Sequence, residues 1–198
     1  MIVDNFEVIR NLLSFKSEGD FYSLQILKRR EDNPFMEINS RVIKNYYISS
    51  LEEFNTLEEE IKLMCSTFNA RAYINPAVKN QERVAFAMIK RIADCVYSKQ
   101  YDCIKGIYQS ECDRSKSDKP IWVIDVDTDS EKTLSELITA VEGCQSGHAI
   151  TTAEIIPTIN GCHVLTYPFN SKELEPFLAT CDDVELKKER QTLLYYSN

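Results

Sequence analysis

The segment Trp122–Asp129, which reads WVIDVDTD, constrains the fold more than any other feature of the chain. Its apolar residues predict a buried β-strand, and side chains two positions apart on a strand point to the same face. Asp125 and Asp127 therefore share one face, while Ile124 and Val126 point into the packing on the other. Two carboxylates this close repel each other unless a cation lies between them. The pair is our candidate chemical centre.

Hard divalent cations such as Mg²⁺ or Mn²⁺ prefer oxygen ligands, and two such ions can activate an attacking oxygen and stabilise a leaving phosphate. The alternative interpretation is structural, because aspartates at a strand end can be solvated or can cap the following helix. Asp129 fits that alternative, since it directly precedes Ser130. For Asp125 and Asp127 the pattern favours a metal.

Apolar periodicity and capping signals divide the first 119 residues into short elements. Ser50 and Glu53 form an S-x-x-E capping box. The predicted elements are helices over 5–15, 50–67 and 79–98, and strands over 21–30, 41–48 and 70–75. Residues 99–119 are less regular, and the polar run ECDRSKSDKP (111–120) at their end predicts a mobile loop or a lobe boundary.

Past Pro120 the pattern changes to strand, helix, strand, strand, helix, strand, and a last strand follows at 192–196. This order is the split β-α-β arrangement. We therefore expect an α+β protein in which an N-terminal αβ lobe, 1–119, packs on a split β-α-β lobe, 120–198, as one compact unit.

Composition excludes several classes of protein. With 198 residues, 43% of them hydrophobic, the chain can bury a sizeable core. It has neither an apolar run of membrane-spanning length nor a recognisable leader, so we expect a cytoplasmic protein without a membrane partner. The net charge of −8 argues against indiscriminate coating of nucleic acid. The seven cysteines include no C-x-x-C pair and predict mostly buried, reduced thiols.

A second candidate element begins at Asn160-Gly161, a strong tight-turn signal. His163 follows as the second residue of the next strand, near the mouth of the sheet, where it can donate to a phosphate oxygen or a ribose hydroxyl. The alternative is a hairpin histidine satisfied by a neighbouring carbonyl. His148 and the tyrosines receive no role.

Taken together, the strand VIDVD (123–127) and the G-x-H strand GCH (161–163) resemble the archaeo-eukaryotic primase superfamily, the primase-polymerase fold. The resemblance implies an RRM-like catalytic sheet and metal-dependent nucleotidyl transfer with Mg²⁺ or Mn²⁺. Asp125 and Asp127 would match the metal-binding pair, and His163 the contact to the incoming nucleotide's phosphates. Asp182, Asp183 and Glu185 compete for the third acid, and Asp183 is favoured because it directly precedes Val184.

Nucleotidyl transfer also needs cations for phosphates. Arg71 and Lys187 are the candidates we expect to bind nucleotide, although such cations are also found on solvated strand ends. The leading hypothesis is an enzyme that adds nucleotides to a 3′-hydroxyl. Its partners would be nucleoside triphosphates, a single-stranded DNA or RNA template, and a helicase or accessory subunit. The alternatives are a catalytically inactive primase-like module that binds nucleic acid or protein, and a metal-dependent nuclease.

Overall fold

The computed structural model describes residues 1–188 and 190–197, and within them the protein is mixed α+β with two antiparallel sheets. The strands are β1 (Ile2–Asp4), β2 (Asp20–Arg29), β3 (Ser40–Ile48), β4 (Arg71–Ile74), β5 (Lys79–Asn80), β6 (Trp122–Val126), β7 (Thr152–Pro157), β8 (Cys162–Thr166), β9 (Val184–Lys187) and β10 (Thr192–Ser197). The helices are α1 (Phe6–Leu12), α2 (Leu51–Phe68), α3 (Gln81–Tyr97), the 3-10 helix η1 (Tyr101–Gly106), α4 (Ile107–Arg114), α5 (Glu131–Gly143) and α6 (Ser171–Leu178).

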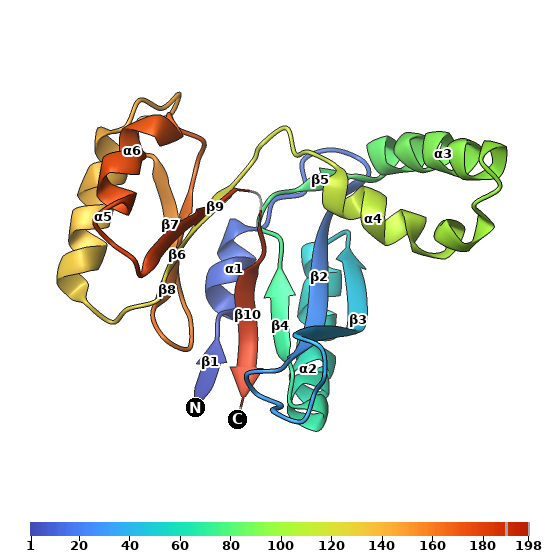
Figure 1. Ribbon diagram of the computed structural model, residues 1–198, viewed down its shortest axis with the longest axis horizontal. Helices are drawn as coiled ribbons and strands as arrows, with labels where there is room; N and C mark the ends of the chain where they lie inside the picture. The colour runs from blue at the N-terminus through green and yellow to red at the C-terminus, as the bar shows by residue number, and fades with distance from the viewer. Residues whose placement is uncertain (189, 198) are drawn as a thin grey trace.

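The first sheet lies in the centre of the molecule, with strand order β1-β10-β4-β2-β3 and β5 paired to β2 (Figure 1). Alternate side chains of its strands, such as Ile26 and Ile74, point into a core made with α1 and α2. Phe6 of α1 and Phe54 of α2 are buried in that core with their rings 5.3 Å apart. Because the helices cover one face only, the opposite face is left for other contacts.

The second sheet has strand order β7-β8-β6-β9, and α5 and α6 pack on one of its faces. Ile124 and Val164 of the sheet contact Leu137 of α5 and Leu174 of α6 in this core. On the other face, apolar residues such as Val123 join the core of the first sheet. The two sheets are therefore packed together, and the polar part of that second face remains at the junction.

The last strand crosses the boundary that the sequence predicts at 119/120. Residues 192–197 form β10, which lies between β1 and β4 in the first sheet. Leu194 and Tyr195 are buried in the core of that sheet, and this burial is the driving force for the return of the chain. The second sheet consequently ends with β9, and the chain's last strand belongs to the first sheet.

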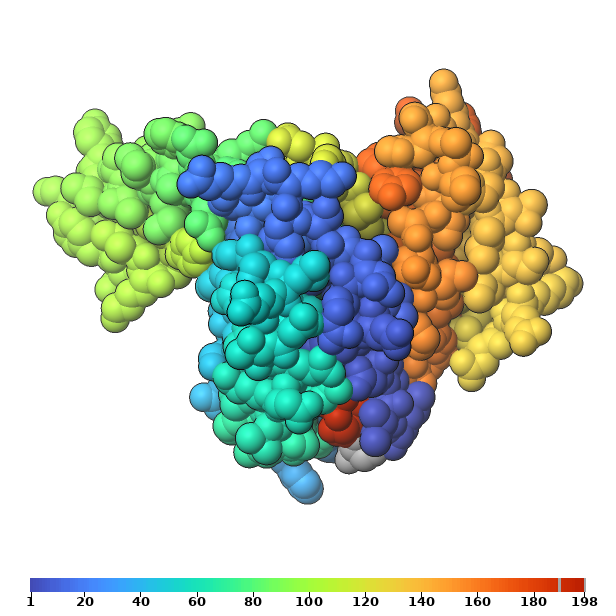
Figure 2. All heavy atoms as spheres, turned by 180° about the vertical axis from the view of Figure 1, so that it is seen from behind, coloured from blue at the N-terminus to red at the C-terminus, as the bar shows by residue number. Residues whose placement is uncertain are grey.

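A helical arm made of α3, η1 and α4 projects from the side of the first sheet opposite to the second (Figures 1 and 2). The predicted helix over 79–98 is confirmed as α3. The less regular stretch after it contains two helices, η1 and α4, so the loop predicted at 111–120 is wrong for residues 111–114, which are helical. Tyr108 packs edge-on against Tyr47 of β3, with ring centroids 4.6 Å apart, and Cys112 is fully buried. These contacts to a distant strand stabilise α4. None of the described helices has both the length and the apolarity that crossing a bilayer requires.

Candidate active site

Strand β6 positions the two aspartates that the sequence singles out. It lies between β8 and β9, and its register places Asp125 directly opposite His163 on one side and Glu185 on the other. Directly opposed residues of antiparallel strands share a face, so these three side chains form a row across three strands. Asp127 lies two positions beyond Asp125, just past the end of the strand, and is exposed.

The Asp125 carboxylate is held by two neighbours. One oxygen lies 3.2 Å from His163 Nε2, and the other accepts a hydrogen bond from Lys187 Nζ at 2.5 Å. Burial alone raises the pKa of this carboxyl, but the hydrogen bonds and charges of His163 and Lys187 outweigh burial and lower the pKa to about 2. Asp125 is therefore ionised throughout the physiological range.

The His163 ring is fixed at both nitrogens. Its Nδ1 lies 2.8 Å from the hydroxyl of Thr192, a fully buried residue of β10 in the first sheet. In the neutral ring these contacts assign the proton to Nε2, which donates to Asp125, while Nδ1 accepts from the Thr192 hydroxyl. A residue of one sheet thus orients the histidine of the other.

Asp127 differs from Asp125 because its carboxylate has no hydrogen-bond or ion-pair partner among the described residues. Its pKa is raised, first by partial burial and then by the negative charge of Asp125. The backbone N–H of Asp127 donates to the carbonyl of Asp183 at 2.8 Å, and the charge of Asp183 raises the pKa of Asp127 further. Two of the three candidate third acids, Asp183 and Glu185, therefore lie beside the aspartate pair.

A divalent cation fits this donor set if substrate completes its coordination. Within residues 1–188 and 190–197, no three His, Cys, Asp or Glu side chains gather closely enough to hold a metal on their own. Mg²⁺ is usually bound through one or two carboxylates together with waters and substrate phosphates rather than by an all-protein cage. Asp127, which has no partner and a raised pKa, is the ligand that a cation would stabilise most, with Asp125 beside it.

The row of side chains opens into a cleft of about 1020 Å³ between the two sheets. One wall belongs to the second sheet and carries three acids, Asp125, Asp127 and Glu185, together with His163 and Lys187. The other wall is the face of the first sheet that α1 and α2 leave uncovered. That wall and the segment before β10 add polar and basic side chains: Gln25, Arg29, Arg71, Tyr73, Asn75 and Arg190. The cleft can thus bring phosphates between cations and carboxylates.

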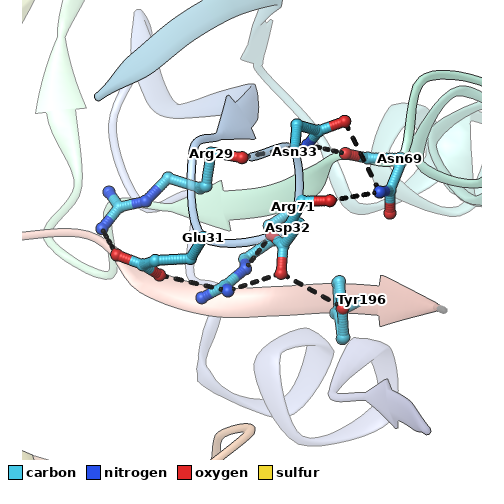
Figure 3. Close-up of polar contacts among 7 residues, drawn as sticks. All are labelled: Arg29, Glu31, Asp32, Asn33, Asn69, Arg71 and Tyr196. Atoms are coloured by element: carbon cyan, nitrogen blue, oxygen red, sulfur yellow. Dashed lines mark hydrogen bonds and ion pairs between the residues drawn. The ribbon is translucent and has the colours of Figure 1, made fainter. Parts of the chain in front are cut away.

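Arg71 lines the cleft, but its guanidinium is already engaged (Figure 3). Its Nε and Nη2 donate to the two carboxylate oxygens of Asp32 at 2.7 and 2.8 Å, and Nη2 lies 3.2 Å from Glu31. Tyr196 donates its hydroxyl hydrogen to Asp32 as well, at 3.2 Å. The sequence predicts that Arg71 contacts nucleotide, whereas its described contacts anchor the turn after β2. A phosphate would have to compete with Asp32 for it.

The sequence carries no signal for Thr192, and it offers Arg29 only as one of three candidate cations in the run Lys28-Arg29-Arg30. Thr192 carries no motif, and only the pairing of β10 brings it to His163. The structure distinguishes Arg29 within this basic run, because Arg29 lines the cleft and its Nε is buried without a hydrogen-bond partner. Its Nη2 lies 3.5 Å from Glu31. Comparison of the chain with protein-family models, curated proteins and solved structures finds no match.

Proposed function

We propose that this protein is a metal-dependent nucleotidyltransferase of the primase-polymerase type, which adds nucleotides to a 3′-hydroxyl on a single-stranded template. The observation that carries the proposal is the cross-strand pair of Asp125 and His163, with the unpartnered Asp127 beside it at the cleft. The sheet order β9-β6-β8-β7, with two helices on one face, is the order expected of the split β-α-β arrangement and supports the resemblance.

A divalent ion bound with the triphosphate would supply charge neutralisation at the transferred phosphate and the leaving pyrophosphate. Asp125 and Asp127 would provide its carboxylate ligands. In the described structure the Asp125 carboxylate instead accepts from His163 and Lys187. If Asp125 were a ligand of the cation, the donors of His163 and Lys187 would be available for phosphate oxygens. Thr192 keeps the Nε2–H of His163 aimed at the cleft, and Arg29 adds positive charge from the opposite wall.

Incubation with labelled nucleoside triphosphates, Mn²⁺ and a single-stranded template, with and without a primer, tests the proposal. We expect labelled extension products from the wild type, loss of product in Asp127→Ala, and retention of product in the matched control Asp129→Ala. Asp129 is an exposed acid beside the Ser130 cap of α5. No product under either condition would reject the proposal, and shortening of the template would indicate a nuclease that uses the same carboxylates.

A second candidate is an inactive module that kept the sheet and binds nucleic acid or protein. The observation that favours it is the internal ion pair, because Lys187 already neutralises Asp125, and His163 donates to it, without a metal. This candidate predicts that neither Mn²⁺ nor nucleotide raises the melting temperature of the protein, whereas the enzyme predicts that both together do.

A further inference from the structure

Two cysteines of the helical arm, Cys95 and Cys103, lie away from the cleft and have no part in the proposed function. Cys95 is in the last turn of α3 and is 3% exposed, while Cys103 is in η1 and is exposed. Both are free thiols, and their sulfur atoms are 3.2 Å apart. The other described cysteines are buried, except for the partly exposed Cys181, as the sequence predicts for most of the seven.

The backbone between the two thiols keeps them together. After α3 ends, Lys99 adopts a left-handed conformation with φ of 58°, which is uncommon for a residue with a side chain. This turn lets the N–H of Gln100 donate to the carbonyl of Cys95 at 2.8 Å. The Cys103 thiol in turn donates to the carbonyl of Gln100 at 2.6 Å. The chain is thereby folded back so that η1 returns its cysteine to α3.

We propose that Cys95 and Cys103 form a dithiol site for reversible exchange with low-molecular-weight disulfides such as oxidised glutathione. The exposed Cys103 thiolate attacks one sulfur of the disulfide, which forms a mixed disulfide and releases one thiolate. Cys95 then loses its proton and attacks the Cys103 sulfur, which forms the Cys95–Cys103 bond and releases the second thiolate. The two protons from the protein end on the released thiols. The protein dithiol is oxidised by two electrons, and the small disulfide is reduced.

The attack of Cys95 on the Cys103 sulfur requires only a small movement of the two sulfur atoms. A disulfide needs its sulfur atoms about 2.0 Å apart, so closing the contact requires a shift on the order of 1 Å. The burial of Cys95 limits direct attack by the small disulfide there, which places the first adduct on Cys103. The new bond would join α3 to η1 within the projecting arm and would restrict its unfolded states.

Peptide mapping of the 198-residue protein tests the proposal directly. The reduced protein is treated with oxidised glutathione, its remaining thiols are blocked with N-ethylmaleimide, and it is denatured and digested with trypsin. Cleavage after Arg91, Lys99 and Lys105 places the two cysteines on separate peptides, 92–99 and 100–105. We expect these peptides to be recovered joined by a disulfide and to separate on treatment with dithiothreitol.

Three variants test which thiol attacks first and which thiol resolves the mixed disulfide. Cys95→Ser should accumulate a glutathione adduct on Cys103, because the resolving thiol is gone. Cys103→Ser should give neither adduct nor joined peptide, and the control Cys181→Ser should give the joined peptide as the wild type does. Circular dichroism checks that each variant is folded. Absence of the joined peptide from the wild type, or a bond from Cys103 to a different cysteine, overturns the proposal whatever the nucleotide assay shows.

Discussion

At the scale of single residues, Asp125 links folding to pH. Its pKa, raised by burial but lowered more by His163 and Lys187, is about 2 against an ordinary 3.8. A carboxyl whose pKa is lowered by folding stabilises the folded protein fully when the pH is above its ordinary, unfolded-state pKa. This stabilisation is lost as the pH falls through the folded-state pKa. We expect about 2 kcal/mol to disappear between roughly pH 4 and pH 2.

Urea unfolding over this pH range compares the wild type with Asp125→Asn. The free energy of unfolding of the variant should fall less steeply with decreasing pH, because the paired carboxylate is missing. Asp129→Asn, which removes an exposed acid, should follow the wild type. Parallel curves for the wild type and Asp125→Asn would show that the carboxylate is not held as described.

Lys187 occupies the place where a cation would lie between carboxylates, 2.5 Å from an Asp125 oxygen and 3.3 Å from a Glu185 oxygen. The substitution Lys187→Met removes this positive charge and leaves the negative charges of Asp125 and Glu185 without it. Mn²⁺ affinity measured by calorimetry without nucleotide should then rise about tenfold, equivalent to roughly 1.4 kcal/mol. Lys188→Met is the matched control, since Lys188 lies over the ring of Trp122. An unchanged or weaker Mn²⁺ affinity in Lys187→Met would contradict this role.

At the scale of elements, Gly161 sets how closely the β7–β8 turn approaches β6. A Cβ atom there would lie 2.1 Å from the carbonyl oxygen of Val126 and 2.9 Å from the nitrogen of Thr128, both of which are backbone atoms. Gly161→Ala should therefore lower the free energy of unfolding by about 2 kcal/mol or more. Gly143→Ala, where a Cβ meets nothing within 4 Å, should be neutral or slightly stabilising. Equal urea midpoints for the two variants would refute the close approach.

Elements with local signals are the ones that the sequence predicts well. Ser50 accepts a hydrogen bond from the N–H of Glu53 at 3.0 Å, and Ser130 does the same for Thr133 at 3.2 Å, so both helices begin where their caps indicate. The helix α4 has no such cap, and its burial depends on Tyr47 of β3. Propensity cannot reveal a helix that tertiary contacts stabilise.

At the scale of the whole molecule, the site depends on how the two sheets meet. Asn5, which is buried, donates from Nδ2 to the carbonyls of Pro157 and Leu193, both at 2.9 Å, and so connects the second sheet to β10. The contact between Thr192 and His163 connects them again at the proposed active site. The relative position of the two sheets therefore fixes the orientation of the histidine.

Replacement of Thr192 by valine keeps the shape of the side chain and removes the hydroxyl that His163 contacts. We expect Thr192→Val to lower the free energy of unfolding by about 1–2 kcal/mol, because Nδ1 loses its partner. Nucleotide incorporation should fall as well. The control is Thr166→Val, since the buried hydroxyl of Thr166 has no partner and its loss should be neutral or stabilising. Similar unfolding midpoints for the two variants would contradict the orienting role.

The sequence predicts the parts of the site that one strand or turn contains, and it misses the parts that require two sheets. The period of two places Asp125 and Asp127 on one face, and the turn at Asn160-Gly161 starts the strand of His163. The occupation of Arg71 by Asp32 and the approach of Thr192 both depend on long-range packing. Spacing along the chain carries no information about such contacts.

The central claim is that Asp125 and Asp127 hold a divalent ion together with a nucleotide. Calorimetric titration of Mn²⁺ in the presence of a non-hydrolysable nucleoside triphosphate tests it most directly, with the ion–nucleotide titration subtracted. We predict binding by the wild type, binding by the charge-matched control Asp129→Asn, and loss of binding in Asp127→Asn. A wild type that binds no Mn²⁺, or an Asp127→Asn variant that binds as tightly as the wild type, would contradict the account.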